Sequence, residues 1–149
     1  MPGVFIDNVS RGRENNLSIH LESKDLINSQ QIEVAVNGPD GATHLILCTG
    51  MTDLSCSGHE TYTFLVGPQL SRRQFVGAIA SGAISTIQYT KPMVSTADLK
   101  LKVGIVLMAA YFDDESGQVK VIAEVSSRIP TIKLAINYNV SILAEMLSY

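Results

Sequence analysis

The sequence contains few cysteines, since Cys48 and Cys56 are the only two among 149 residues. Small secreted domains that depend on disulfides carry many more, which excludes a disulfide framework here. A chain of this length can bury enough apolar surface to fold without one. We therefore predict a single domain over residues 1–149, with both cysteines kept as reduced thiols.

Charge of either sign is also scarce. Charged residues are 17% of the chain against 46% hydrophobic residues, and the formal net charge is -3. Disordered chains show the opposite balance, so this composition predicts a folded protein. The eleven Lys and Arg residues are scattered along the chain. A nucleic-acid partner usually requires a basic patch, so we expect no nucleic-acid binding.

No apolar run is long enough to cross a bilayer as a helix. The longest run, Val103 to Phe112, is about half of the roughly 20 residues that a membrane-spanning helix needs. The first fifteen residues, MPGVFIDNVSRGREN, lack the basic segment followed by an apolar one that marks a secretory signal. We therefore expect a soluble, cytoplasmic protein with no membrane partner.

Alternation of apolar and polar residues is the dominant pattern, and it is typical of strands with one buried face. Residues 99–112 alternate and then become apolar on both faces, a polar loop follows, and residues 118–125 alternate again. Residues 32–36 and 42–48 form a second pair around the turn-forming sequence Asn-Gly-Pro-Asp-Gly. Both pairs predict antiparallel β-hairpins.

The C-terminal residues 131–148 fit a strand and a helix equally well, because their polar residues recur at every fourth position. β-branched residues and asparagines dominate up to Ile142, whereas residues 143–147 are good helix formers. We predict a strand that ends in a short helical turn.

One internal stretch predicts a helix, at residues 71–84. Ser71 and Gln74 have the spacing of a capping box, and Leu70 and Phe75 have the spacing of a hydrophobic staple. Apolar residues then recur at helical spacing. The predicted fold class is therefore mainly β, leaning to α+β, with antiparallel sheets in a sandwich or barrel-like arrangement and this one helix.

Residues 44–60 gather two of the three histidines and both cysteines, which are residue types that bind zinc. In a straight strand, His44 and Cys48 would be about 13 Å apart, too far to share one ion. A three-ligand zinc site remains if the residues after Cys48 form a loop that folds back. Its ligands would be Cys48, Cys56 and His59, completed by Asp53 or Glu60.

The same segment offers a candidate catalytic group. Cys56 and His59 are close enough in sequence to act as nucleophile and base, with Asp53 to orient the histidine. Such a cysteine needs a lowered pKa. The competing interpretation is purely structural, with Cys48 as a small core residue and His59 as a loop residue.

The absence of a specific catalytic motif favours a non-enzymatic binding or assembly module. Residues 99–112 need cover on both faces, from a second sheet, from the predicted helix or from a second subunit. We therefore expect a homo-oligomer without a cofactor. Two alternatives stay open: a zinc-binding protein or Cys/His-dependent enzyme that uses residues 48–60, and a carrier of an unknown small molecule inside a barrel or sandwich.

Overall fold

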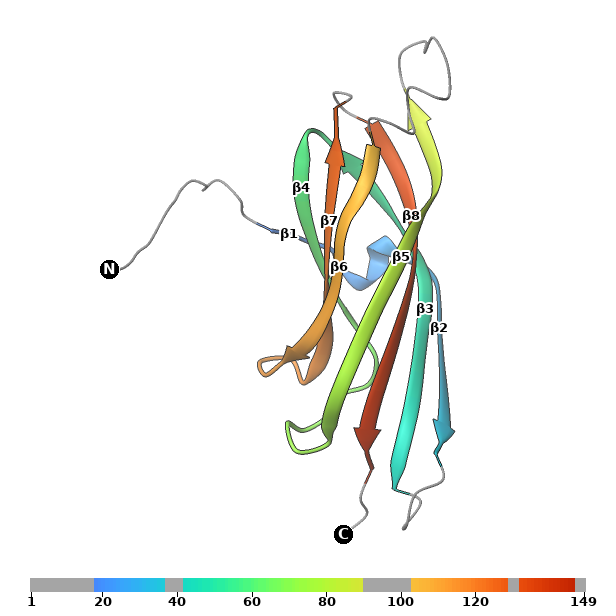
Figure 1. The fold of residues 1–149 in the computed structure, drawn as a ribbon, viewed down its shortest axis with the longest axis vertical. Coiled ribbons are helices and arrows are strands. Elements are labelled where there is room, and N and C mark those ends of the chain that lie inside the picture. The colour runs from blue at the N-terminus through green and yellow to red at the C-terminus, as the bar shows by residue number, and fades with distance from the viewer. Residues whose placement is uncertain (1–17, 37–41, 90–102, 129–131, 147–149) are drawn as a thin grey trace, which may run out of the picture.

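The computed structural model describes residues 18–36, 42–89, 103–128 and 132–146. These residues are almost entirely β-structure, as Figure 1 shows, and they include no α-helix. Within them, no helical segment has the length and apolar character needed to cross a membrane. The strands are β1 (Ile19–His20), β2 (Leu26–Ala35), β3 (Thr43–Cys56), β4 (His59–Val66), β5 (Phe75–Tyr89), β6 (Val103–Asp113), β7 (Gln118–Ser127) and β8 (Ile132–Glu145), with a single 3-10 turn, η1 (Ser23–Asp25).

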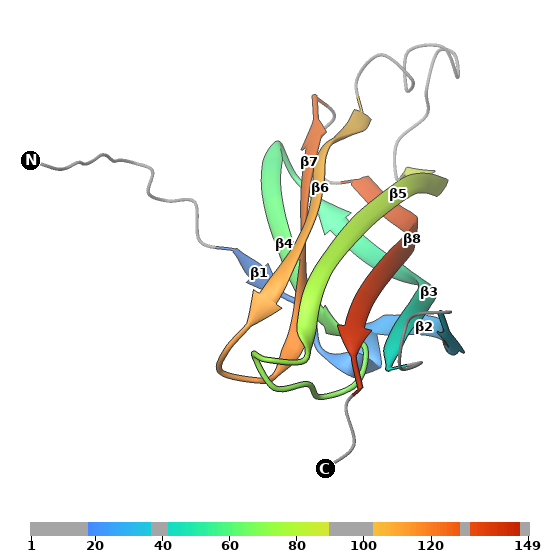
Figure 2. The same ribbon diagram turned by 60° about the horizontal axis from the view of Figure 1, so that its bottom comes forward.

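The strands form two four-stranded sheets with the orders β1-β4-β7-β6 and β2-β3-β8-β5. All neighbours are antiparallel except β1 and β4, which are parallel. Figures 1 and 2 show the sheets facing each other, with β5 and β6 side by side where the sheets approach most closely. The predicted mainly β fold with antiparallel sheets is confirmed.

The space between the sheets holds the core. Alternate residues of β7 and β8 are buried, as expected where one face of each strand is covered. The rings of Phe64 on β4 and Tyr138 on β8 meet across the gap, with centroids 4.9 Å apart. The most completely buried large side chains come from both sheets: Ile46, Phe64, Val119, Val121, Val125, Ile132, Ile136, Val140 and Ile142.

Both predicted hairpins are present. β6 and β7 pair in register around a turn in which Asp113 accepts hydrogen bonds from the backbone N–H and the hydroxyl of Ser116, at 3.0 and 2.6 Å. β2 and β3 form the second hairpin. Residues 99–102 of the first prediction and the turn residues 37–41 of the second lie outside the described ranges.

The predicted helix at residues 71–84 is wrong, although its predicted start is correct. Ser71 and Gln74 make the capping box: the Gln74 N–H donates to the Ser71 hydroxyl at 3.3 Å, and the Ser71 N–H donates to the Gln74 side chain at 2.8 Å. The backbone completes one turn, with the Phe75 N–H on the Ser71 carbonyl at 3.2 Å. From Phe75 onward the chain is strand β5.

The sequence of β5 explains why the turn does not continue as a helix. Gly77 and Gly82 weaken a helix, and Ile79, Ile84 and Ile87 favour a strand. β5 pairs with β8 along almost its whole length. A side chain at Gly82 would lie 3.0 Å from the Met108 side chain of β6, so this glycine allows β5 and β6 to approach.

The C-terminal prediction is correct for the strand and wrong for the helical turn. β8 runs from Ile132 to Glu145 without interruption. Residues 143–145 keep pairing with β3, with Leu143 opposite Leu45 and Glu145 opposite Thr43. Residues 131, 147 and 148 of that prediction are not among those described.

Candidate functional site

The sequence-predicted site residues are dispersed by the extended form of β3. The residues between Cys48 and Cys56 belong to this strand, so the loop predicted to fold back here is wrong. At about 3.3 Å per residue, the two cysteines are about 26 Å apart. That distance excludes one zinc ion bound to both within a single chain, and both cysteines are free thiols.

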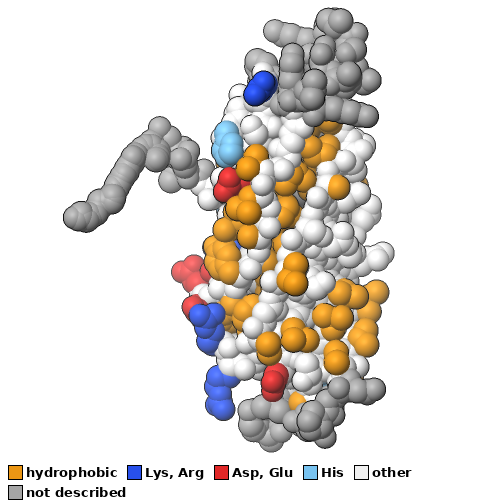
Figure 3. All heavy atoms as spheres, in the orientation of Figure 1, with side chains coloured by type: hydrophobic (Ala, Val, Ile, Leu, Met, Phe, Trp, Pro, Cys, Tyr) orange, Lys and Arg blue, Asp and Glu red, His pale blue; other side chains and the backbone are white. Residues whose placement is uncertain are grey.

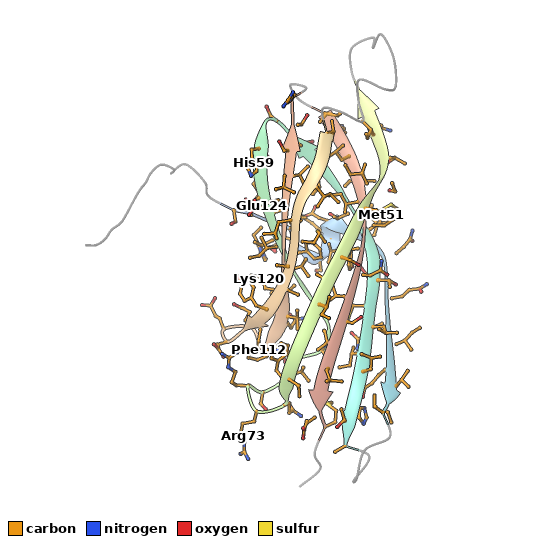
Figure 4. The ribbon with its side chains drawn as sticks, viewed as in Figure 1. Met51, His59, Arg73, Phe112, Lys120 and Glu124 are labelled. Atoms are coloured by element: carbon orange, nitrogen blue, oxygen red, sulfur yellow. The ribbon has the colours of Figure 1, made fainter. Side chains whose placement is uncertain are left out.

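The two-residue period of strands also separates Asp53 from Cys56. Asp53 is exposed on the outer face of its sheet, whereas Cys56 is buried between the sheets. His59 begins β4 in the other sheet and lies next to Glu124 of β7, with 3.5 Å between the imidazole Nε2 and the carboxylate (Figure 4). The structure therefore places Asp53, which was predicted to orient His59, on the opposite face of the sheet from the Cys56 thiol.

The surroundings of Cys56 favour a neutral thiol. Burial, and next the nearby Glu60 carboxylate, raise the pKa of Cys56. Its Sγ donates to the Gly58 carbonyl at 3.4 Å. The hydroxyl of buried Tyr62 donates to the Ser55 carbonyl at 2.6 Å and lies 2.8 Å from the Glu60 carboxylate. Burial is the main cause that raises the Tyr62 pKa, and the hydrogen bond to Glu60 is the second. A nucleophilic cysteine needs the opposite shift.

Among the described residues, no group of three or more His, Cys, Asp and Glu side chains is arranged to hold a metal ion. Cys48 lies on the inner face of β3, and burial raises the pKa of its thiol from 9.0 to about 11. The imidazole of His44, on the same strand, is hydrogen-bonded to the Glu33 carboxylate of β2. Cys48 and His44 thus have separate surroundings.

A cleft opens between the sheets on the side of β2. Its volume is about 330 Å³, and Cys48 is part of its wall. The hydroxyl of buried Tyr138 lies 3.3 Å from the hydroxyl of Ser29 in this cleft. The other lining residues are Ser23, Leu26, Gln30, Gln31, Leu65, Val66, Gly67 and Gln118.

No other described strand covers the outer face of the β2-β3-β8-β5 sheet, and the two ends of this face differ in their side chains. Register places Val34, Leu45 and Leu143 in one row across three strands, and Ile32, Leu47, Ser141 and Ile79 in the next row across four. Exposure reaches 58% for Ile32 and 75% for Ile79. We call this end the apolar half: Ile32, Val34, Leu45, Leu47, Ile79 and Leu143. Figure 3 shows hydrophobic side chains gathered over the corresponding ends of these strands.

The other end of the same face, which we call the polar half, carries mostly polar side chains. Met51 lies on it (Figure 4) and pairs with Ile27 of β2, but its partner on β8 is Asn137, and Thr49 and Asp53 flank it along β3. A shallow hollow of about 300 Å³ lies here and is lined partly by Asp53 and Lys133. The polar residues of this half are Thr49, Asp53, Ser55, Ser81, Lys133, Asn137 and Asn139.

A smaller apolar surface lies on β6. The opposite sheet covers one side of this strand, where Phe112 is buried. The outer side is exposed at Leu107 and Tyr111, and Val106, the extra residue of a bulge, is 58% exposed. Among the described residues, the cover predicted for both faces of this strand is therefore provided on one face only.

Sequence reasoning missed the apolar half. The alternation at residues 32–36 indicated a strand with a buried apolar face, yet Ile32, Val34 and Val36 are exposed. The relevant signal was in β3, where Leu45 and Leu47 interleave with Ile46 and Cys48, so that both faces are apolar. Such a run shows that a strand needs cover on both faces, but it does not show which face the chain's own core covers.

Comparisons with family models, curated proteins and solved structures find no match to this chain. The function is therefore argued from the geometry of the described residues.

Proposed function

We propose that the protein is a self-associating β-sandwich module whose copies join through the apolar half of the β2-β3-β8-β5 sheet. The observation that carries the proposal is the pair of apolar rows on the outside of a sheet whose inner face already forms the core. Scattered exposed apolar side chains are ordinary on protein surfaces, but a contiguous patch of large ones marks an interaction site.

The position of the apolar half supports a second copy as its partner. Its residues belong to neighbouring strands of one sheet, so they form a continuous surface rather than a pocket for a small ligand. The surface has no charged side chain within its two rows. Apolar surfaces without charge are typical of the buried centres of subunit interfaces.

The test is the oligomeric state of the purified protein, measured by analytical ultracentrifugation over a wide range of concentrations. We expect a dimer or larger assembly. Replacing Ile32 and Val34 by Lys should weaken the assembly by at least about tenfold, because each buried aliphatic side chain contributes about 1.5–3 kcal/mol. Asn139→Lys in the polar half is the matched control and should leave the assembly intact. A wild-type protein that stays monomeric at every concentration contradicts the proposal.

The cleft beside Tyr138 supports a second candidate function, the binding of a small molecule between the sheets. Its lining combines apolar side chains with hydroxyl and amide groups, which is typical of ligand sites. Its volume of about 330 Å³ limits the ligand to a small molecule. A screen of small fragments by protein-observed NMR tests this: hits that perturb Ser29 and Gln118 support it, and hits that avoid the cleft contradict it.

A further inference from the structure

β2 is a free edge of its sheet among the described strands, and half of that edge is regular. From Gln30 to Ala35 its pairing with β3 advances one residue at a time. Between Ile27 and Gln30 the register shifts, and Asn28 has a positive φ of 55°. Bulges of this kind prevent a further strand from pairing. The regular segment, residues 30–35, has no such protection.

The hydrogen bonding of β2 shows which backbone groups face outward. The Val36 N–H donates to the Thr43 carbonyl at 2.8 Å, so these residues form a hydrogen-bonded pair of the antiparallel ladder. Such pairs alternate, so Val34, Ile32 and Gln30 also bond to β3. The N–H and C=O groups of the intervening residues, Gln31, Glu33 and Ala35, therefore point to the free edge.

The side chains along this segment also permit pairing. It contains no lysine or proline, the residues that commonly block an edge. Its single charged residue is Glu33, whose carboxylate is paired with His44 of β3. On the outer face, Ile32 and Val34 continue the apolar rows up to the edge itself.

We infer that two copies of this chain pair antiparallel through β2, with the two-fold axis at Ile32, and so join their sheets into one of eight strands. This inference rests on the proposed self-association and places its contact at the edge of the apolar half, where the Ile32 side chains of the two copies meet, rather than across the sheet face. Both apolar halves would then lie on the same face of the continuous sheet. An antiparallel edge pair is self-complementary, because each strand offers the same alternating donors and acceptors.

Charge selects the register. In the paired sheet, the outer face of one copy must continue as the outer face of the other. This condition allows the two-fold axis to pass through Ile32, Glu33 or Val34. An axis at Glu33 places two like charges directly opposite, which is unfavourable. An axis at Val34 places Glu33 opposite Ala35 of the other copy. An axis at Ile32 places Glu33 opposite Gln31 of the other copy, whose side-chain amide can donate a hydrogen bond to the carboxylate. The register at Ile32 gives Glu33 a complementary partner twice by symmetry.

Disulfide trapping tests this register directly. In the inferred dimer the two copies of Ile32 form a non-hydrogen-bonded pair with Cα atoms about 4.5 Å apart, within reach of a disulfide. The two copies of Val34 would be offset by about 13 Å along the strands. Under mild oxidation we expect Ile32→Cys to give a covalent dimer and Val34→Cys and Glu33→Cys to give little. Wild-type protein, whose own cysteines are buried, is the background control.

A proline variant tests the edge without relying on cysteine chemistry. The Gln31 N–H points away from β3, so Gln31→Pro removes a hydrogen bond between copies and leaves the ladder within the chain. We expect Gln31→Pro to be a folded monomer by ultracentrifugation and circular dichroism, while Gln31→Ala, which keeps the N–H, still dimerises. The cysteine variants decide the matter if the proline variant fails to fold.

The outcomes separate the inference from the proposed function. A wild-type monomer overturns both. A dimer that survives Gln31→Pro, gives no Ile32→Cys link and dissociates with Ile79→Lys, on the far strand of the sheet, overturns the edge pairing and supports face-to-face packing. A covalent dimer from Val34→Cys or Glu33→Cys in place of Ile32→Cys overturns the register.

Discussion

The two halves of the outer face of the β2-β3-β8-β5 sheet share one backbone and differ in their chemistry. In the apolar half, Val34, Leu45 and Leu143 are aligned across three strands. In the polar half, Thr49 and Asn139 occupy an equivalent row. β3 and β8 pair without a register shift through both halves, so the difference between these rows comes from their side chains.

The edge strand β2 also differs between the polar half and the apolar half. Beside the polar half, β2 is interrupted by its register shift and by the positive φ of Asn28. Beside the apolar half, it is regular and lacks blocking residues. Edges that must not pair are usually interrupted or charged. The comparison shows an interrupted edge beside the polar half and a regular edge beside the apolar half, and the proposed pairing of copies rests on this difference.

The largest expected effect contrasts Ile46, on the inner face of the sheet, with Ile32, in the apolar half of the outer face. Ile46 is fully buried on the inner face, so Ile46→Ala should lower the free energy of unfolding by about 2–5 kcal/mol, measured by urea denaturation. Ile32→Ala, on the exposed outer face, should change it by about 0.5 kcal/mol or less when measured on the monomer. Equal losses would show that the outer face is also packed within one chain.

The next effect concerns Gly50, which lies on the inner face of β3, behind the polar half. A side chain here would overlap the ring and hydroxyl of Tyr138 on the adjacent strand. Gly50→Ala should cost about 1–3 kcal/mol, from overpacking. Gly77→Ala is the control, because its added Cβ would meet nothing within 4 Å. If thermal denaturation shows the two variants to be alike, the tight contact with Tyr138 is not present in solution.

A smaller effect tests the interrupted edge beside the polar half. Asn28 adopts a positive φ that a β-branched residue tolerates poorly, so Asn28→Val should cost about 1–2 kcal/mol. Asn28→Gly, which accepts this conformation, should stay close to wild type. Chemical denaturation compares the two. A valine variant as stable as the glycine variant would contradict the positive φ of Asn28 in β2.

The smallest effect is a pH dependence from Cys48, on the inner face. Because burial raises its pKa from 9.0 to about 11, the thiol ionises more easily in the unfolded chain. Stability is therefore complete below pH 9 and falls as pH rises toward 11, by under about 1 kcal/mol at about pH 9.5. Measured by urea denaturation, the free energy of unfolding of Cys48→Ala should change less with pH than that of the wild type. An equally strong pH dependence would show that Cys48 is not its cause. At neutral pH, a thiol reagent should label Ile79→Cys on the outer face and spare Cys48.

The hairpins could be predicted from the sequence, because alternation and turn residues act over a few neighbouring positions. The capping box of Ser71 and Gln74 was predictable for the same reason, since its hydrogen bonds join residues three apart. The strand after it was not predictable from that signal. β5 is fixed by pairing with β8, where Ile79 lies opposite Ser141, far away in the sequence.

The candidate site shows the same limit. Cys56 and His59 are three residues apart, yet the first belongs to β3 and the second to β4, in different sheets. Asp53 is closer still to the cysteine, but strand geometry turns it to the opposite face. Nearness along the chain predicts nearness in space in a turn, and it fails where strands separate successive side chains.

The sequence by itself therefore determined a chain of strands, their hairpins and one capped turn, because these depend on local backbone preference and residue period. Only the tertiary structure decided that β5 is a strand, that the cysteines are about 26 Å apart and that Ile32 and Val34 face outward. The physical reason is that pairing partners and the choice of buried face depend on residues distant in the sequence, which a local pattern does not specify.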